Sequence, residues 1–221
     1  MMRKSMKCLL AFGLTLFVTL HVQAGGAVKQ TASVLGQTSN DCSVPLPGAG
    51  PRAVIDGGSA SIIRTMNGFS ASISLPTPLS GTYCYPSQTL GGNAAAGPAV
   101  PGHPEAFSFW GIYFNSPEGC GAGGCGASDV GGPNCVNAQA GAIKLSGHVT
   151  GGGRLHLSGH ISTNEDPLIG CSRLVDVLGA EIHLAIAPHG MLTPSLMPTQ
   201  IQVPPGGGPG YWFPAVFLPV E

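Results

Sequence analysis

The sequence predicts an all-β fold, a single antiparallel β-sandwich with long loops rich in glycine and proline that disulfides tether. Short segments alternate apolar and polar residues with the period of two that marks a half-buried strand. The chain holds 35 glycines and 20 prolines, and both residues disfavour long helices. An even number of cysteines in an exported chain predicts disulfides, because the compartment is oxidising.

Residues 1–24 predict a secretory signal peptide. The segment has three basic residues among its first seven, an apolar run from Cys8 to about Leu20, and the sequence Val22-Gln23-Ala24, which suits cleavage after Ala24. The run is too short to cross a bilayer comfortably, and no second long apolar run follows. We therefore expect a secreted or periplasmic protein with no membrane span after the signal is removed.

The mature chain would have 197 residues and six cysteines. The glycine-rich sequence CGAGGC favours a small loop closed between Cys120 and Cys125. No C-x-x-C pair occurs, which makes structural zinc the weaker interpretation of the cysteines. The pairing of the other four cysteines is left open; these are Cys42, Cys84, Cys135 and Cys171.

Charge excludes one class of partner. Three of the nine basic residues leave with the signal, so six basic residues face ten acidic ones and the mature net charge is −4 with neutral histidines. There is no basic patch, so nucleic acid is not expected as a partner. Only 9% of all residues are charged, well below the usual quarter, which indicates a surface of uncharged polar groups.

The remaining chain divides into an N-terminal arm ordered in part, residues 25–50, and a β-sandwich domain, residues 51–221. Loops are expected where glycine and proline gather, at 86–104, 115–138 and 188–210. The clearest strands are FSASISL (69–75, half-buried), FSFWGIYF (107–114, central and covered on both faces), GAEIHLAIA (179–187) and YWFPAVFLPV (211–220, confined to an edge by its prolines).

Three histidines lie in a segment that predicts a β-hairpin. Residues 143–150 and 154–161 alternate in polarity, and the triplet 151–153 is glycine throughout. A three-residue loop would place His148 opposite His156, with Cβ atoms about 4.5–5.5 Å apart. His160 would lie about 13 Å along the strand from His156.

This face allows two interpretations. Two opposed imidazoles and His183 on a neighbouring strand would supply three ligands for copper or zinc, with Glu181 or His189 as further candidates. The second interpretation is a solvated or partner-facing sheet surface that contains histidine, and the nearby cations Lys144 and Arg154 favour it. We therefore favour the solvated or partner-facing surface over the metal site.

The sequence AGAIKLSGHVTGGGRLHLSGHIS, followed by AEIHLAIAPHG, resembles the layout of CHRD domains, a family first described in chordin. The resemblance covers about residues 140–190. His183 would match the second histidine of the family's HIH signature and Gly190 its final glycine, while Glu181 replaces the first histidine. The resemblance implies an extracytoplasmic β fold with a role in binding, and it does not imply catalysis.

Catalytic motifs are weak. No G-x-S-x-G elbow is present, and cysteines held in disulfides offer no nucleophile. Tyr211 and Trp212 follow a glycine-rich turn and are candidates for an exposed binding surface. We therefore expect a non-enzymatic protein with a binding or structural role, a protein or glycan partner, and no cofactor. The alternative is a periplasmic protein that binds copper or zinc through His148, His156 and His183. Dismutase-like activity is the third possibility.

Overall fold

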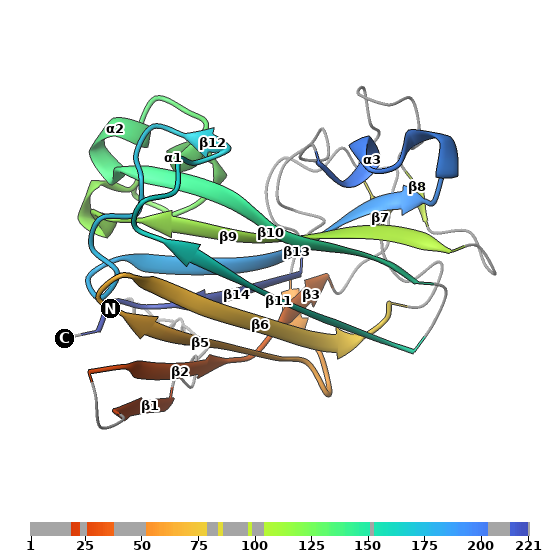
Figure 1. Ribbon diagram of the computed structural model, residues 1–221, viewed down its shortest axis with the longest axis horizontal. Helices are drawn as coiled ribbons and strands as arrows, with labels where there is room; N and C mark the ends of the chain where they lie inside the picture. Colours follow the sequence, from red (N-terminus) through yellow and green to blue (C-terminus); the bar gives the residue numbers. More distant parts are fainter. Residues whose placement is uncertain are drawn as a thin grey trace, which may run out of the picture.

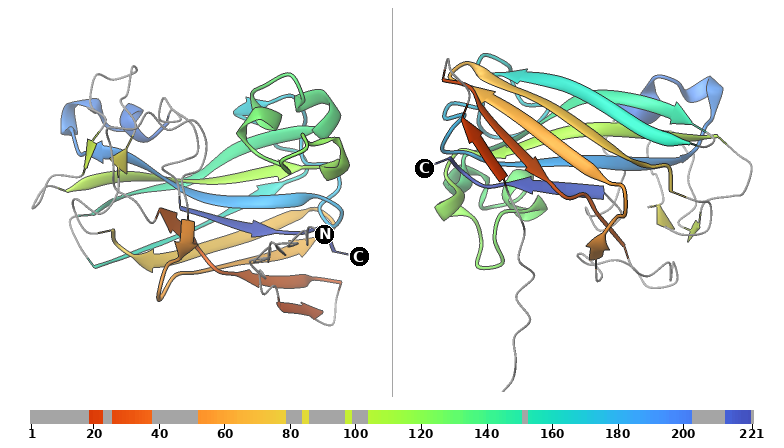
Figure 2. Two further views of the ribbon diagram at one scale, coloured as in Figure 1. Left: turned by 180° about the vertical axis from the view of Figure 1, so that it is seen from behind. Right: turned by 90° about the horizontal axis from the view of Figure 1, so that it is seen from below.

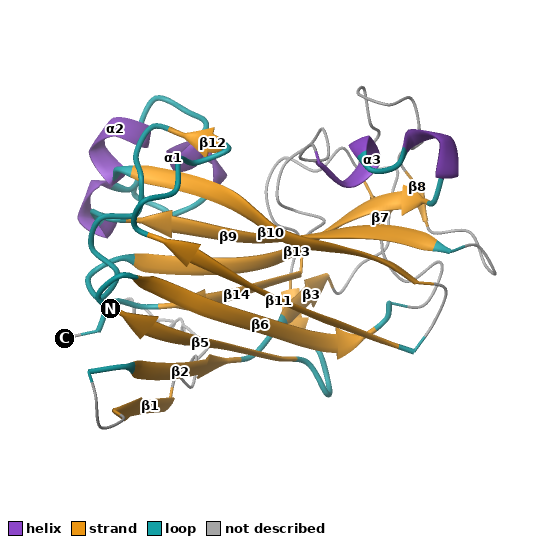
Figure 3. Cartoon of the chain, in the orientation of Figure 1, coloured by secondary structure: helices purple, strands orange, loops and turns teal. Residues whose placement is uncertain are grey.

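The computed structural model describes residues 19–22, 26–37, 52–78, 84–85, 97–98, 104–150, 153–202 and 213–220. The chain forms two five-stranded antiparallel sheets that pack face to face, as Figures 1 and 3 show. The predicted all-β sandwich is therefore confirmed. In the described residues no helix is long and apolar enough to cross a membrane.

The first sheet has the strand order β1-β2-β5-β6-β11, and the second has the order β12-β10-β9-β13-β14. Their bounds are β1 Thr19–Val22, β2 Val28–Ala32, β5 Ser59–Thr65, β6 Gly68–Pro76 and β11 Arg154–Ser162 in the first sheet, and β9 Glu105–Phe114, β10 Ala140–Thr150, β12 Ile169–Gly170, β13 Glu181–Met191 and β14 Phe213–Phe217 in the second.

Smaller elements complete the fold. Two short strand pairs join β3 (Leu35–Gln37) to β4 (Arg52–Val54) and β7 (Cys84–Tyr85) to β8 (Gly97–Pro98). The long loops also contain short helical turns: η1 Pro117–Gly119, α1 Ala127–Val130, α2 Cys135–Ala138, η2 Pro194–Leu196 and α3 Thr199–Gln202. Figure 2 shows α1 and α2 at one end of the second sheet and α3 at the other.

The two sheets differ in how they are covered. Alternate residues of both sheets fill the space between them, including Ile62, Phe69, Leu155, Ile182 and Phe217. The second sheet also buries its other face, in a cluster around Trp110 and Phe114 beside the helical turns and the disulfides. This second cluster explains why FSFWGIYF is apolar on both faces, and β9 is the central strand that the sequence predicts.

The predicted hairpin between 143–150 and 154–161 is wrong. β10 pairs with β9 and β12, whereas β11 pairs with β6, so the two strands belong to different sheets. β10 carries an irregularity between Lys144 and Ser146. Leu145, at this irregularity, packs closely over Gly159 of β11: a Cβ atom added to Gly159 would lie 2.7 Å from the Cβ of Leu145. The two strands therefore cross instead of pairing side by side.

Part of the expected N-terminal arm belongs to the sandwich. β2 pairs with β5 over five residues, and Val28, Ala32 and Val34 are buried. At the other end of the chain, β14 holds the outer position in the second sheet. An edge position is what Pro214 requires, because proline has no N–H to donate to a further strand.

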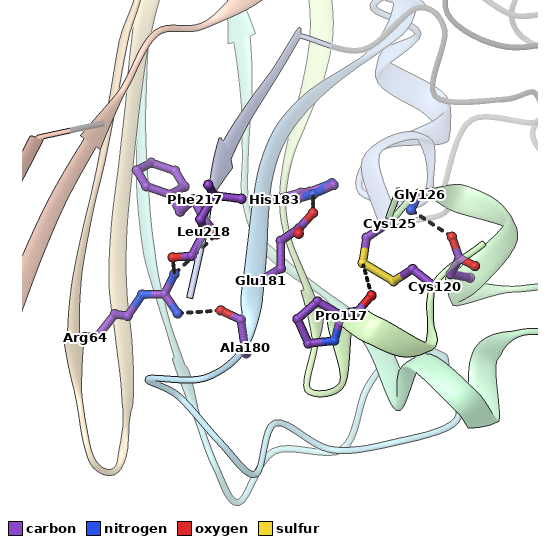
Figure 4. Close-up of polar contacts among 11 residues, drawn as sticks. Arg64, Pro117, Cys120, Cys125, Gly126, Ala180, Glu181, His183, Phe217 and Leu218 are labelled. Atoms are coloured by element: carbon purple, nitrogen blue, oxygen red, sulfur yellow. Dashed lines mark hydrogen bonds and ion pairs between the residues drawn. A yellow bond between two sulfur atoms is a disulfide. The ribbon is translucent and has the colours of Figure 1, made fainter. Parts of the chain in front are cut away.

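A buried arginine joins the two sheets. Arg64 is fully buried on the inner face of β5, and its guanidinium donates to the carbonyls of Val177 (2.7 Å), Ala180 (2.7 Å) and Leu218 (2.9 Å), as Figure 4 shows in part. Its Nε donates to Gln30 Oε1 at 2.7 Å. Burial lowers the pKa of Arg64 to about 10, and the charge of Asp176 opposes this shift.

Candidate binding face and the placement of the predicted site residues

The three predicted metal ligands lie on three strands in two different sheets. His148 is exposed on β10 opposite Phe107, and His156 is exposed on β11 opposite Ser74. His183 lies on β13, in the second sheet. The structure therefore does not place His148 opposite His156. Among the described residues, no group of three or more His, Cys, Asp or Glu side chains is close enough to hold a metal ion.

His183 has local partners instead. Its Nε2 lies 2.6 Å from Glu181 Oε1, and both side chains are about one-sixth exposed. Its ring also packs edge-on against Phe114, with ring centroids 5.0 Å apart. Figure 4 shows the pair on β13, away from the first sheet. Glu181 therefore orients His183, and neither residue lies with His156.

His189, the other candidate ligand, is fully buried. Its Nε2 lies 2.6 Å from Ser108 Oγ, which accepts a hydrogen bond from Trp110 Nε1 at 2.7 Å. Because the indole can only donate, the serine hydroxyl hydrogen is available to the neutral imidazole. Burial, and to a lesser extent the charge of Lys144, lower the pKa of His189 to about 4, while a hydrogen bond with the Gln200 backbone opposes the shift. The histidine, the serine and the tryptophan lie on β9 and β13 of the second sheet, and the Gln200 side chain in α3 donates to the carbonyls of His189 (3.3 Å) and Met191 (2.7 Å), which holds this turn against β13.

The predicted disulfide between Cys120 and Cys125 is confirmed. A second disulfide joins Cys135 to Cys171, a pairing that the sequence left open. Cys42, Tyr211 and Trp212 lie outside the described residues, and for Cys84 only the backbone is described.

A buried carboxylate organises the small disulfide loop. Asp129 is fully buried and accepts from the backbone N–H groups of Gly121 (3.1 Å) and Gly126 (2.9 Å) and from the Asn134 amide (3.2 Å). These donors lie inside, beside and beyond the loop closed by Cys120 and Cys125. The long segment 115–138 is thus an ordered cover for the second sheet.

The outer face of the first sheet is the candidate site, and sequence reasoning identified only part of it. We call this surface the hydroxyl face. Its residues alternate with the core residues of four strands, and they are Lys29, Thr31, Ser59, Ser61, Ile63, Ser70, Ser72, Ser74, Arg154, His156, Ser158 and His160. The feature of the sequence that indicates this face is the alternation of serine in FSASISL. The serines of β5 lie in register with it.

The register aligns these side chains in rows across the sheet. Thr31, Ser61, Ser72 and Ser158 form one row of four hydroxyl groups, one on each strand. Neighbouring strands lie about 4.8 Å apart, so the row presents a regular series of polar groups. Ser61 Oγ and Ser72 Oγ are hydrogen-bonded at 2.9 Å, and Ser70 Oγ lies 3.2 Å from His160 Nδ1.

A depression of about 450 Å³ lies at one end of this face. It is bordered by hydroxyl residues of β5 and β6, by His156 on β11 and by Lys29 on β2. Arg154 stands beside it and donates to Ser74 Oγ at 2.9 Å and to the Gly57 carbonyl at 2.7 Å. None of the residues of β2, β5, β6 and β11 is acidic. The depression therefore combines hydroxyl groups with Lys29, has Arg154 at its border, and is lined by no carboxylate.

Fold and surface together define an all-β sandwich with one face covered by loops and one polar face left open. Comparisons of the sequence and structure with protein-family models, with curated proteins and with solved structures find no match.

Proposed function

We propose that this protein is exported and binds an acidic glycan on the hydroxyl face. The observation that carries the proposal is the composition of that face: rows of hydroxyl groups with Lys29, Arg154 and two histidines, and no carboxylate on its four strands. The mature chain expected from the sequence has a net charge of −4, so the cations on this face contrast with the rest of the molecule.

The chemistry of the ligand follows from these groups. Hydroxyl side chains both donate and accept hydrogen bonds, which matches the hydroxyl groups of a sugar. Lysine and arginine attract carboxylate or sulfate groups, and their hydrogen bonds to such anions are stronger than neutral ones. A face of four strands also gives an extended surface, which suits a polymer better than a single small molecule.

Two further features support the setting of the proposal. Two disulfides fit an oxidising compartment, in agreement with the signal peptide that residues 1–24 predict. The CHRD resemblance over 140–190 implies a binding role outside the cytoplasm. Both features concern location and class, and the ligand is proposed from the hydroxyl face alone.

Calorimetric titration of the mature protein tests this proposal. The probes are polygalacturonate, a uronic acid polymer, and dextran, a neutral polymer. We expect binding of polygalacturonate that weakens with added salt, and little binding of dextran. Lys29→Glu places a carboxylate in the depression and should weaken binding at least about tenfold, equivalent to about 1.4 kcal/mol.

Arg173→Glu is the matched control, because Arg173 is an exposed cation outside the hydroxyl face. It makes the same change of charge and should leave binding unaltered. Equal losses in both variants would indicate attraction by net charge only and would contradict a site on this face. Absence of polygalacturonate binding by the folded wild-type protein would contradict the proposed ligand.

A further inference from the structure

The outer edge of the first sheet is formed by a segment that the sequence predicts to be removed. β1 pairs with β2 in antiparallel register over four residue pairs, from Thr19 opposite Thr31 to Val22 opposite Val28. β1 is the outermost strand of this sheet, next to β2 (Figure 1). Among the described residues no further strand pairs with the outer side of β1. The edge of β2 therefore accepts an antiparallel strand.

Cleavage after Ala24 would take β1 away and leave β2 as the edge strand. The backbone N–H and C=O groups that β1 satisfies would then face solvent, and such an edge is a template for pairing with another chain. Natural edges are protected by proline, by bulges and by charged side chains, lysine in particular. β2 has the sequence VKQTA, which has no proline, and it pairs with β5 without a register shift. Its one charged residue, Lys29, lies on the outer face.

The sequence of β2 is complementary to itself in antiparallel pairing. In a two-fold arrangement centred on Gln30, Lys29 of each copy lies opposite Thr31 of the other, so the two lysines do not face each other. Val28 lies opposite Ala32, and both residues are on the inner, apolar face. Like charges directly opposite would destabilise the pair, and this register avoids them.

We propose that the mature protein forms a two-fold dimer through β2, in which the two first sheets join edge to edge. Such an interface is isologous, because the same strand is used by both copies. The proposal rests on the predicted cleavage and on the edge geometry, and it is independent of the ligand proposed above. In the dimer the hydroxyl faces of both copies lie side by side on one continuous sheet of eight strands, four from each copy.

Light scattering coupled to size-exclusion chromatography, over a series of protein concentrations and without glycan, tests the dimer. A chain that begins at Gly25 should show twice the monomer mass. A chain that begins at Thr19 keeps β1 and should be monomeric, because an attached strand competes at an effective concentration on the order of millimolar. Mass spectrometry of the exported protein identifies its first residue separately.

A charge pair tests the register. Thr31→Lys places a lysine opposite Lys29 of the other copy and should abolish the dimer, with a far-UV circular dichroism spectrum that shows an intact fold. The double variant Lys29→Glu with Thr31→Lys places opposite charges across the same interface and should restore it.

Three results would overturn the proposal. These are a mature chain that stays monomeric at all concentrations, a Thr31→Lys protein that stays dimeric, and a double variant that stays monomeric although it is folded. A mature wild-type protein that is monomeric and still binds polygalacturonate would contradict only this inference. A stable dimer that binds no polygalacturonate would contradict only the proposed function.

Discussion

Replacement of Arg64 by methionine should destabilise the protein by about 4 kcal/mol. The guanidinium makes five hydrogen bonds, four to backbone carbonyls and one to the Gln30 amide oxygen. At about 1.5 kcal/mol for each bond from a charged donor, they contribute about 7.5 kcal/mol. The lowering of the Arg64 pKa from 12.5 to about 10 corresponds to a cost of about 3 kcal/mol for keeping the charge buried. The difference gives the expected loss.

Urea denaturation with intact disulfides, followed by tryptophan fluorescence, measures this loss. The free energy of unfolding of Arg64→Lys should lie between those of wild type and Arg64→Met. The ammonium group of lysine donates from one point, so it cannot reach all the acceptors that surround the planar guanidinium. Arg173→Met is the control: its ion pair with Asp166 is exposed to solvent and should contribute little to stability. A loss within about 1 kcal/mol for Arg64→Met would refute the argument, since the three buried carbonyls of Val177, Ala180 and Phe217 would then need no donor.

The buried histidine and the disulfides give two further predictions. The folded-state pKa of His189 is about 4 against an ordinary value of 6.5, so protons bind more tightly to the unfolded chain, and stability present above pH 6.5 should fall by about 3 kcal/mol as the pH drops to 4. His189→Gln should remove this part of the dependence in denaturation measured across that range; an unchanged pH profile would contradict it. Replacing Cys135 and Cys171 by alanine opens a loop with a sequence separation of 36 and should cost about 4 kcal/mol, whereas the same change at Cys120 and Cys125, with a separation of 5, should cost about 2 kcal/mol. Thermal unfolding compares the two variants, and a reversed order would contradict the loop-entropy argument.

Alternation of polarity predicted the faces of the strands but not all of their partners. Leu155, Leu157 and Ile161 point into the core as their parity requires. The same parity is satisfied whether β11 pairs with β10 in a hairpin or crosses to the other sheet, because both arrangements turn the apolar side inward. The choice between them depends on packing between distant strands, such as the contact of Leu145 with Gly159, which no local pattern contains.

The candidate site was accessible to sequence reasoning in part. Alternation predicts that the serines of FSASISL form the polar side of one strand and that the histidines of β11 form the polar side of another. Their alignment in rows with Thr31 and Lys29 depends on the strand order β2-β5-β6-β11, which alternation does not contain. Arg64 was missed although a signal existed: it continues the inward series of Ala60 and Ile62 in β5. A charged residue at an inward position indicates a buried polar network.

The two sheets are covered unequally, so a substitution in the second sheet has a different effect from a substitution on the outer face of the first. The second sheet is buried on both faces, so a substitution in β9 or β13 alters volume or polarity within a packed cluster. Side chains of the hydroxyl face contact solvent and one another, and their replacement leaves the apolar interior untouched. Substitutions on that face should change stability by less than about 0.5 kcal/mol. The chemistry of the hydroxyl face can thus diverge among descendants of this chain, or be redesigned, while the scaffold itself is retained.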